Sequence, residues 1–366
     1  MEARSSFTVL AALTIPFLSS SMVVYSIIFK VFYLAARVGA QASFVSAAMS
    51  FSFYGGALGG LVLGGLADRY GRRRMIFVSA LIYSFSIFLV LAVRGLADLY
   101  MLWALVGFGV NAENGITYVQ IVELMRSMRG ALGGFVQGLY FLGMFVDSLL
   151  SYYIESPEIY FLAIGGFGVL SSFLLLLLPE TRASLGQAEG GKKLFSAKLI
   201  IGSLVSFSAF FYTITLVTFA PIFAGSRSTI YYSFVGFSSF IIFGYLSDRI
   251  SRTDVSIALQ TAGLLAAALA LFKALGMQII FLVLYVATAY FAYLGVWLGE
   301  LFDSRIRATA VNVCLLVGRL IGGAGPAIVA FAGSSDLLAA YFTALLAAAL
   351  VGLAASVLFK ALSGRR

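Results

Sequence analysis

The stretch GGLADRYGRRR, residues 64–74, decides the fold, because a shorter copy of it, GYLSDRISR, recurs at residues 244–252. In each copy a long apolar stretch ends in Gly-x-Leu-(Ala/Ser)-Asp-Arg and then becomes basic. The two aspartates, Asp68 and Asp248, are separated by about half of the 366-residue chain. One such motif is compatible with an ordinary charged loop, whereas two copies at half-length spacing predict a duplicated membrane unit.

The composition places the chain in a lipid bilayer. Hydrophobic residues make up 61% of the sequence and charged residues 11%, whereas soluble domains are about 45–50% apolar and about 25% charged. Charge-free runs recur along the chain, and most approach the roughly 20 residues that a helix needs to cross the hydrocarbon core. These runs are continuous rather than alternating, which excludes a transmembrane barrel. We predict an all-α, polytopic membrane protein.

Twelve membrane-spanning helices are predicted once charges inside the spans are allowed for. The longest polar connection, RASLGQAEGGKKLFSAK, begins at Arg182 and falls between the sixth and seventh spans. We therefore predict a six-helix bundle at 1–181, a cytoplasmic linker at 182–197 and a second six-helix bundle at 198–366. The predicted spans are 7–33, 41–66, 75–93, 98–122, 130–152, 158–178, 198–223, 228–246, 254–273, 277–299, 307–331 and 336–359.

Basic side chains are distributed unequally over the predicted loops. With the GRRR loop placed in the cytoplasm, most of the 24 Lys and Arg residues fall on that side, as the positive-inside rule requires. The net charge of +9 therefore reflects topology, and we expect no nucleic acid partner. An even number of spans predicts a multi-pass protein of the cell membrane with both termini in the cytoplasm.

A second pair of charged motifs repeats at nearly the same spacing. IVELMRSMRGAL (121–132) closes the fourth predicted span and opens the fifth, and LGELFDSRIRATA (298–310) does the same for the tenth and eleventh. Glu123 precedes Arg129 in the first motif, and Glu300 precedes Arg307 in the second. Parallel six-helix repeats with a binding site near the bilayer midplane are a recurrent plan of secondary transporters.

At these residues the chain resembles the major facilitator superfamily, a family of two-bundle secondary transporters. GGLADRYGRRR is similar to the loop signature of that superfamily. RGALGGFVQGLYFLG (129–143) and PETR (179–182) resemble elements of its sugar-porter branch, and ELFDSRIRATAVNVCLLVGRLIGG (300–323) resembles its metabolite:proton symporters. The resemblance implies twelve transmembrane helices in two six-helix bundles, related by a pseudo-two-fold repeat.

The resemblance also implies a cytoplasmic gate built from the loop charges. Opposite charges on neighbouring helix ends can bond in one conformation and separate in the other, which biases a two-state equilibrium. The alternative is that these charges only set the topology. The implied gate comprises Asp68, Arg69, Gly71, Arg72, Arg73, Glu123, Arg129 and Glu180, together with Asp248, Arg249, Glu300 and Arg307.

Three ionisable residues fall inside predicted spans. Glu113 lies about 15 Å along the fourth helix from Glu123, where a charge costs roughly 2.5–3.5 kcal/mol. Burial favours the neutral form of a carboxyl group, so Glu113 is either a residue that carries the coupling proton or binds substrate, or one partner of a structural ion pair. Arg319, about 18 Å along the eleventh helix, can attract a carboxylate substrate or pair with Glu113. Asp147, about 27 Å along the fifth, is either a coupling residue or an interfacial one.

Polar side chains near Glu113 are candidates for substrate recognition. Asn111, Asn114 and Tyr118 lie on the same predicted helix, and Gln137 lies about 12 Å into the fifth. An amide offers a donor and an acceptor together, which suits the hydroxyl groups of a solute. Resemblance to sugar porters implies a sugar ligand at Gln137, although the seventh span, unlike theirs, contains no Gln or Asn. The alternative role of Gln137 is packing between helices.

Glycines recur at four-residue spacing in three predicted spans. Small residues at this spacing allow two helices to approach closely in lipid. The spacing therefore predicts close helix contacts at these positions. The glycines are Gly56, Gly60 and Gly64, Gly134 and Gly138, and Gly318 and Gly322.

The predicted function is secondary active transport of a small polar organic solute, a sugar or an organic acid or other metabolite, by proton symport with alternating access. The chain has no histidine, a single cysteine and no nucleotide-binding or metal motif, so we expect no cofactor, no metal and no enzymatic activity. A proton gradient is the expected driving force, and a monomer in the lipid bilayer is the expected state. The alternatives are a proton-coupled efflux antiporter, an uncoupled carrier, a non-transporting membrane sensor and a membrane enzyme.

Overall fold

The chain is helical nearly throughout the part that the structure describes. The computed structural model describes residues 2–124, 129–178, 196–302 and 306–363, and no β-strand occurs among them. Helices satisfy their own backbone N–H and C=O groups, as a segment surrounded by lipid must do. The predicted all-α class is confirmed.

The first half of the chain forms six spans within the described residues. Most are single helices, and the others are a helix continued by a short neighbouring one. The elements are α1 (Glu2–Phe29), α2 (Val31–Val38), α3 (Ala42–Ser46), α4 (Ala48–Tyr70), α5 (Arg72–Phe88), η1 (Leu89–Ala92), α6 (Leu96–Leu124), α7 (Arg129–Tyr153), α8 (Pro157–Ser172) and η2 (Phe173–Leu177).

The second half is built in the same way but is more interrupted. Its eleventh span contains a short π-helical turn, η4, between two α-helices. The elements are α9 (Ala197–Arg249), α10 (Arg252–Leu271), α11 (Met277–Ala287), η3 (Thr288–Tyr293), α12 (Leu294–Gly299), α13 (Arg307–Val317), η4 (Gly318–Gly322), α14 (Gly325–Ala332) and α15 (Leu337–Ser363).

The spans agree in number with those predicted. Ten helical stretches among the described residues are long and apolar enough to cross a membrane. One of them, α9, supplies two spans, because it bends at Gly225, where φ is 77° and only glycine is free of strain. The remaining span is α6, whose 29 residues extend about 43 Å. The prediction of twelve spans is confirmed.

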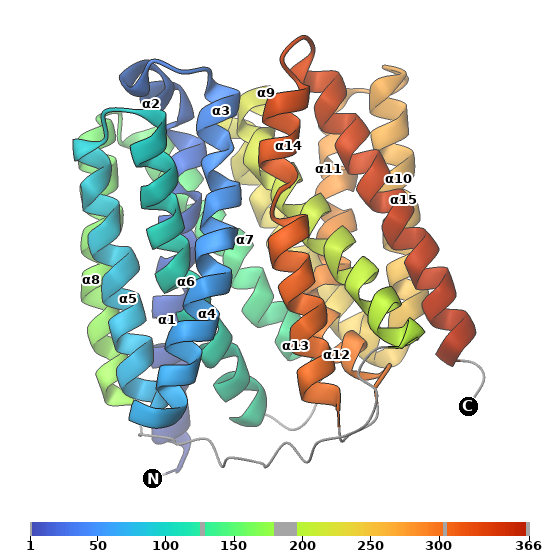
Figure 1. Ribbon diagram of the computed structural model, residues 1–366, viewed down its shortest axis with the longest axis horizontal. Helices are drawn as coiled ribbons and strands as arrows, with labels where there is room; N and C mark the ends of the chain where they lie inside the picture. Colours follow the sequence, from blue (N-terminus) through green and yellow to red (C-terminus); the bar gives the residue numbers. More distant parts are fainter. Residues whose placement is uncertain (1, 125–128, 179–195, 303–305, 364–366) are drawn as a thin grey trace. The chain divides into compact units, whose positions relative to one another are not determined.

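Helices α4 and α6 lie side by side and touch backbone to backbone (Figure 1). A Cβ atom added at Gly107 of α6 would overlap the carbonyl oxygen of Ser52 on α4. Cβ atoms added at Gly55 and Gly59 of α4 would likewise overlap carbonyl oxygens of α6. Such contact is the means by which small residues join helices where lipid removes the hydrophobic driving force.

The glycine prediction is right for two spans and right only in part for the third. Gly134 and Gly138 contact Phe240 and Phe237, and Gly318 and Gly322 contact the chain around Phe210. On α4, a Cβ at Gly56 would overlap the side chain of Asn111 on α6, whereas Gly55 and Gly59 meet the α6 backbone and a Cβ at Gly64 would meet open space. Four-residue spacing alone cannot choose between adjacent registers in a run of paired glycines.

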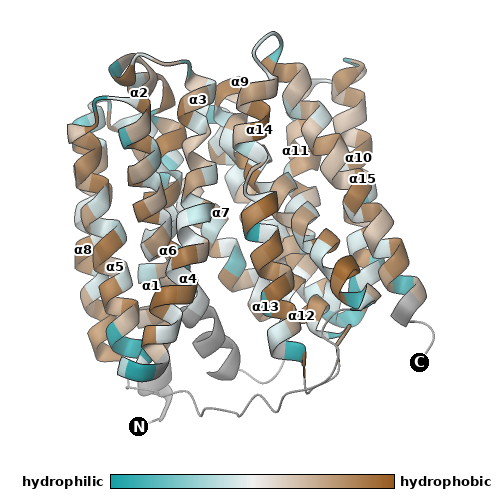
Figure 2. Ribbon diagram, viewed as in Figure 1, coloured by the Kyte–Doolittle hydropathy of each residue, from teal (hydrophilic) through white to brown (hydrophobic). Residues whose placement is uncertain are grey.

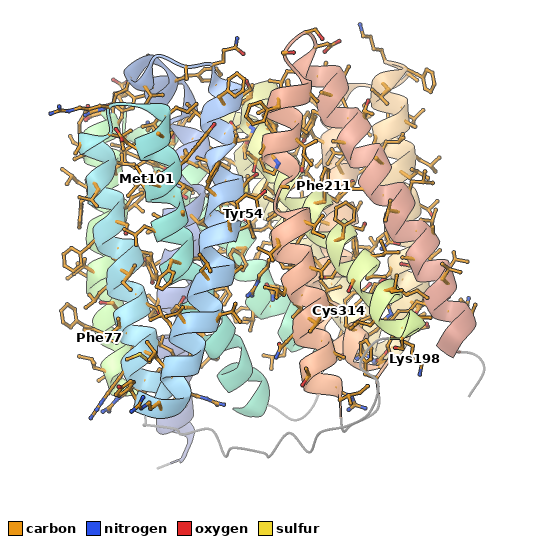
Figure 3. The ribbon with its side chains drawn as sticks, viewed as in Figure 1. Tyr54, Phe77, Met101, Lys198, Phe211 and Cys314 are labelled. Carbon is orange, nitrogen blue, oxygen red and sulfur yellow. The ribbon has the colours of Figure 1, made fainter. Side chains whose placement is uncertain are left out.

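Large apolar side chains cover the outward faces of the helices. The bodies of the helices are coloured hydrophobic, and hydrophilic colour marks the end of α4 and the start of α5 (Figure 2). Met101 on α6 (Figure 3) is 66% exposed, and Leu170 and Phe272 are also largely exposed. Exposed apolar surface on this scale indicates contact with lipid rather than water.

The single cysteine of the chain, Cys314 on α13, is buried (Figure 3). Its Sγ lies 3.8 Å from the hydroxyl of Ser203 and 3.7 Å from the carbonyl oxygen of Leu199, both on α9. A Cβ at Gly202 would lie 2.9 Å from this sulfur atom. The thiol therefore packs between α13 and the first turns of α9.

The contacts divide the chain into two compact units. Unit 1 contains Met1–Arg126, Leu139–Ser184 and Ala224–Ser233, and unit 2 contains Ser127–Gly138, Leu185–Phe223 and Phe234–Arg366. Helices α7 and α9 therefore contribute to both units. The predicted bundles, 1–181 and 198–366, stay a prediction, and most of the predicted linker at 182–197 lies outside the described residues.

We expect Gly107→Ala to destabilise the protein by about 1–3 kcal/mol, because the added methyl group has no room against the α4 backbone. The thermal-unfolding midpoint of the purified protein in detergent measures this effect. Gly64→Ala is the matched control, and it should be neutral or slightly stabilising because alanine is the better helix former. Equal midpoints for the two variants would contradict the backbone contact.

Candidate functional site

Glu113 lies near the middle of α6 and is fully buried within unit 1. Its Oε1 atom accepts a hydrogen bond of 3.3 Å from Thr117, one helix turn away. Its Oε2 atom has no hydrogen-bond partner among the described residues. A charged carboxylate with so little compensation is costly to bury. The geometry therefore suits a carboxyl group that is protonated for part of a cycle.

Hydroxyl groups from neighbouring helices lie beside this carboxyl group. Ser20 on α1 is close enough to interact with it as a hydrogen-bond donor, and Tyr83 on α5 is close enough to interact with it electrostatically. The Tyr83 hydroxyl donates to the carbonyl oxygen of Pro16 at 3.2 Å. Proline within a helix disturbs the regular backbone hydrogen bonding around it, and Pro16 lies inside α1. The carboxyl group thus faces a polar interior between α1, α5 and α6.

A hydrogen-bonded chain joins three helices next to Glu113. Ser20 donates to Asn114 Oδ1 at 2.9 Å, and Asn114 Nδ2 donates to the Tyr140 hydroxyl on α7 at 2.5 Å. Tyr140 also packs edge-on against Phe17 and Tyr25 of α1. These hydrogen bonds link Tyr140 of α7 to Ser20 of α1 and Asn114 of α6, so a movement of the α6 backbone around Glu113 would also displace Tyr140.

The other predicted polar residues are less closely grouped. Asn111 is buried and donates to the carbonyl oxygen of Gly107 at 3.3 Å on its own helix. Gln137 is half-buried on α7 and belongs to unit 2, and the side chain of Tyr118 lies outside the described part. Arg319 lies on η4 in unit 2. Its pairing with Glu113 would join the two units and stays a prediction.

Asp147 lies on α7 and is fully buried. The sequence left open whether it is an interfacial residue or a coupling residue. Its complete burial argues against a solvated position at the interface. Asp147 lies seven residues beyond Tyr140, which places both on one face of α7, two turns apart.

The first charged motif is only partly described. Gly71 separates α4 from α5 with φ of 102°, so the chain turns sharply between Arg69 and Arg72. Arg73 donates to the carbonyl oxygen of Leu178 at 3.3 Å. The side chains of Asp68, Glu123 and Arg129, and the whole of Glu180, lie outside the described part of the structure.

In the second motif, Asp248 binds the start of helix α7, and both belong to unit 2. Its carboxylate accepts hydrogen bonds from the backbone N–H of Gly130, at 3.0 and 2.9 Å, and from that of Ala131, at 3.0 Å. The N-terminus of a helix has unpaired N–H groups and a positive dipole end, so it binds a carboxylate well. A Cβ at Gly130 would lie 2.6 Å from Gly244 O, so this approach needs glycine.

Arg252 joins the two acidic residues of this motif. It forms an ion pair of 2.5 Å with Asp248 and a second ion pair with Glu300. Arg307, which the repeat places in this cluster, instead donates from Nε to the carbonyl oxygen of Phe302 at 3.3 Å. Arg249 is exposed, with its guanidinium 5.1 Å from the Tyr245 ring centroid. Asp248 and Glu300 are thus brought together, with Arg252 rather than Arg307 between them.

Comparison with known proteins decides the family. The sequence pattern of the Major Facilitator Superfamily matches residues 9–286. The chain belongs to the Major Facilitator Superfamily. Members of this superfamily are transporters, so the chain is a multi-pass membrane transporter of a small molecule and not an enzyme.

Two relatives and one solved structure are similar to this superfamily member over most of its length. A protein of Cupriavidus pinatubonensis, inferred to be a 4-methylmuconolactone transporter, is 29% identical over 73% of this chain and 69% of its own length. A protein of Haemophilus influenzae, assigned by inference to metabolite transport, is 24% identical over 83% of this chain and 82% of its own. The xylose transporter XylE of E. coli, solved in an inward open conformation, has a TM-score of 0.75 at 18% identity, covering 97% of this chain and 95% of its own.

Several residues of this superfamily member were missed by the sequence reasoning. Arg252 could have been found, because it follows Asp248 by four residues as Arg72 follows Asp68. Ser20 belongs to the run Ser19-Ser20-Ser21 within an apolar span, which was a usable signal. Tyr140 and Tyr83 gave none, since the chain contains 19 tyrosines and only the fold distinguishes these two.

We expect Asp248→Ala to destabilise the protein by about 1–2 kcal/mol, because it removes the cap of α7 and leaves Arg252 with one acidic partner. Thermal unfolding in detergent measures the loss. Asp254→Ala is the control, since it removes an exposed acidic residue from the first turn of α10 together with its ion pair to Lys360, which is worth about 0–1 kcal/mol. An Asp248→Ala midpoint as high as that of Asp254→Ala would contradict the capping role.

Proposed function

We propose that this transporter couples the uptake of a small polar organic metabolite to the entry of protons. The observation that carries the proposal is Glu113, a fully buried carboxyl group with one oxygen unpartnered among the described residues. A group that is buried when neutral and costly to bury when charged can bind a proton in one conformation and release it in another. Symport by alternating access follows from this property.

The polar chain around Glu113 supports a link between proton and substrate. Asn114 bonds to Ser20 and to the Tyr140 hydroxyl, so a solute that displaces either bond alters the surroundings of the neighbouring carboxyl group. Asn111 and Gln137 remain the further candidates for contact with solute hydroxyl or carbonyl groups. Arg319 is the candidate for a carboxylate group of the solute.

The substrate class that we propose is a small organic metabolite rather than a sugar. The relative from C. pinatubonensis is named for 4-methylmuconolactone, and the relative from H. influenzae for metabolite transport. The likeness to the xylose transporter concerns the fold alone, at 18% identity. A thermal-shift screen of the purified protein against organic acids, lactones and sugars tests this class, because a ligand that binds the native state raises its stability.

The contact of Asp248 with the start of α7 supports a gating role for the second charged motif. Three backbone hydrogen bonds and two ion pairs meet at Asp248 and Arg252. Because these bonds join segments far apart in the sequence, their formation and loss can bias a two-state equilibrium. The first motif, from Asp68 to Arg73, takes the corresponding role by repetition of the sequence.

The remaining parts of the proposal concern topology and assembly. The basic ends of α4 and α5 face the cytoplasm of the cell, which places both termini there, by the positive-inside rule. The transporter acts in the cell membrane as a monomer, and a proton gradient replaces any cofactor.

We expect Glu113→Gln to abolish proton-driven accumulation of substrate in liposomes while largely preserving counterflow. Glutamine keeps the shape of the protonated side chain but cannot release a proton. Accumulation under an imposed pH gradient and exchange without a gradient are the two measurements. The control is Glu155→Gln, which makes the same change at an exposed site. Accumulation at the wild-type level in Glu113→Gln would refute coupling at this residue.

We expect Arg252→Gln to slow turnover with little change in KM, because it disconnects Glu300 from Asp248 without touching the proposed substrate site. A bias of about 1.4 kcal/mol corresponds to a change of about tenfold in rate. Initial rates of uptake over a range of substrate concentrations separate kcat from KM. Lys360→Gln, which breaks an exposed ion pair, should leave both unchanged. An unchanged kcat in Arg252→Gln would remove this motif from the gate.

A further inference from the structure

A second carboxyl group in unit 1, Asp147, is buried without a hydrogen bond of normal geometry among the described residues. Neither of its oxygens has a partner, and its side chain is fully buried. The Tyr160 hydroxyl on α8 lies close enough to the carboxyl group to interact with it as a hydrogen-bond donor, although neither group makes a hydrogen bond of normal geometry among the described residues. Three polar atoms therefore meet in one buried place between α7 and α8.

The obvious counter-ion, Lys30, is engaged elsewhere. Its Nζ atom donates to the carbonyl oxygens of Ser151, at 3.3 Å, and Ile154, at 2.9 Å. These carbonyl groups lie at the C-terminal end of α7, the negative end of its dipole, where a cation is stabilised. The same ammonium group lies 5.0 Å from the centroid of the Tyr160 ring. Tyr160 therefore contacts both Lys30 and Asp147, while no ion pair joins those two.

The other elements near Asp147 bring no buried charge to it. From α9, Ser226 accepts a hydrogen bond of 2.7 Å at its carbonyl oxygen from Ser148, and the neighbouring Arg227 is exposed. From α1, Tyr25 packs against Tyr140 on α7. An ionised Asp147 would thus be a buried charge with the Tyr160 hydroxyl as its one nearby donor among the described residues, which is a costly arrangement in a protein interior.

We propose that Asp147 and Tyr160 form a second proton-binding site, in which the Asp147 carboxyl group carries the proton and Tyr160 adjoins it. The site is separate from Glu113. Asn114, beside Glu113, is bonded to Tyr140, and Asp147 lies seven residues beyond Tyr140, about 10 Å along α7. This site rests on its own geometry and holds whether or not Glu113 couples transport.

Whether the Asp147 carboxyl group carries its proton also determines which groups Lys30 binds. While Asp147 is protonated, Lys30 is free to hold the two carbonyl oxygens at the end of α7. After Asp147 releases its proton to water, the carboxylate needs a counter-ion, and Lys30 can serve only by giving up those two bonds. Proton loss at Asp147 therefore loosens the junction between α7, α8 and the end of α1.

Infrared spectroscopy of the purified, full-length protein at neutral pH tests the site directly, because protonated and ionised carboxyl groups absorb at different frequencies. We expect Asp147→Asn to remove one band of a protonated carboxyl group, and Glu113→Gln to leave that band in place. We expect Tyr160→Phe to keep the band and shift its frequency. An Asp147→Asn spectrum identical to that of the wild type in this region would overturn the proposal.

Thermal unfolding as a function of pH provides a second test that does not depend on assigning bands. A buried acid that is neutral in the folded state stabilises the protein at low pH, and that stability is lost as rising pH removes its proton. We expect Asp147→Asn, measured in a Glu113→Gln background, to reduce the fall in midpoint between neutral and alkaline pH. An equal fall in the unfolding midpoint for the Glu113→Gln protein with and without Asp147→Asn would overturn the proposal. The Glu113 coupling hypothesis stands or falls separately, on the liposome measurements.

Discussion

The absence of water from the hydrocarbon core imposes one requirement on every part of this chain: each polar group inside it needs an internal partner or must be neutral. The backbone meets the requirement by forming helices, and the helices approach closely through glycines such as Gly55, Gly59 and Gly107. Serine and threonine hydroxyls meet it by bonding to carbonyl groups of their own helices, as Ser26 and Thr14 do. The carboxyl groups of Glu113 and Asp147 meet it poorly, because Oε2 of Glu113 and both oxygens of Asp147 lack a hydrogen bond of normal geometry among the described residues, and this is the reason for proposing them as proton-binding sites.

Helix α7 connects the proposed gate with the buried acids. At its first turn the N–H groups of Gly130 and Ala131 bind the carboxylate of Asp248, and at its last turn the carbonyl groups of Ser151 and Ile154 bind Lys30. Both ends of the helix dipole are thereby complemented by opposite charges. Tyr140, between these ends, receives the hydrogen bond from Asn114. Residues of α7 therefore take part in each of the three proposed sites.

The sequence predicted the fold well because membrane spans depend on local composition. Twelve apolar runs, the repeated Asp68 and Asp248 motifs and the buried position of Glu113 were all readable from residue type and spacing. The partners of these residues were not, because a partner comes from another helix whose rotation the sequence does not state. The sequence analysis chose Arg307 instead of Arg252, and it included Gly64 but not Gly55 and Gly59, since each choice depends on which face of a helix meets its neighbour.

Because Cys314 is buried between α13 and α9, the reactivity of its thiol reports on the separation of these two helices. A thiol reacts only when a reagent can reach it, and Cys314 is the sole cysteine of the chain, enclosed between α13 and the first turns of α9. Its rate of alkylation during turnover would measure how often those two helices separate. For the same reason, a pair of cysteines placed on exposed loops could carry spectroscopic labels in the resting protein while Cys314 stays unreacted, so that the distance between the two labels becomes measurable without first removing the native cysteine.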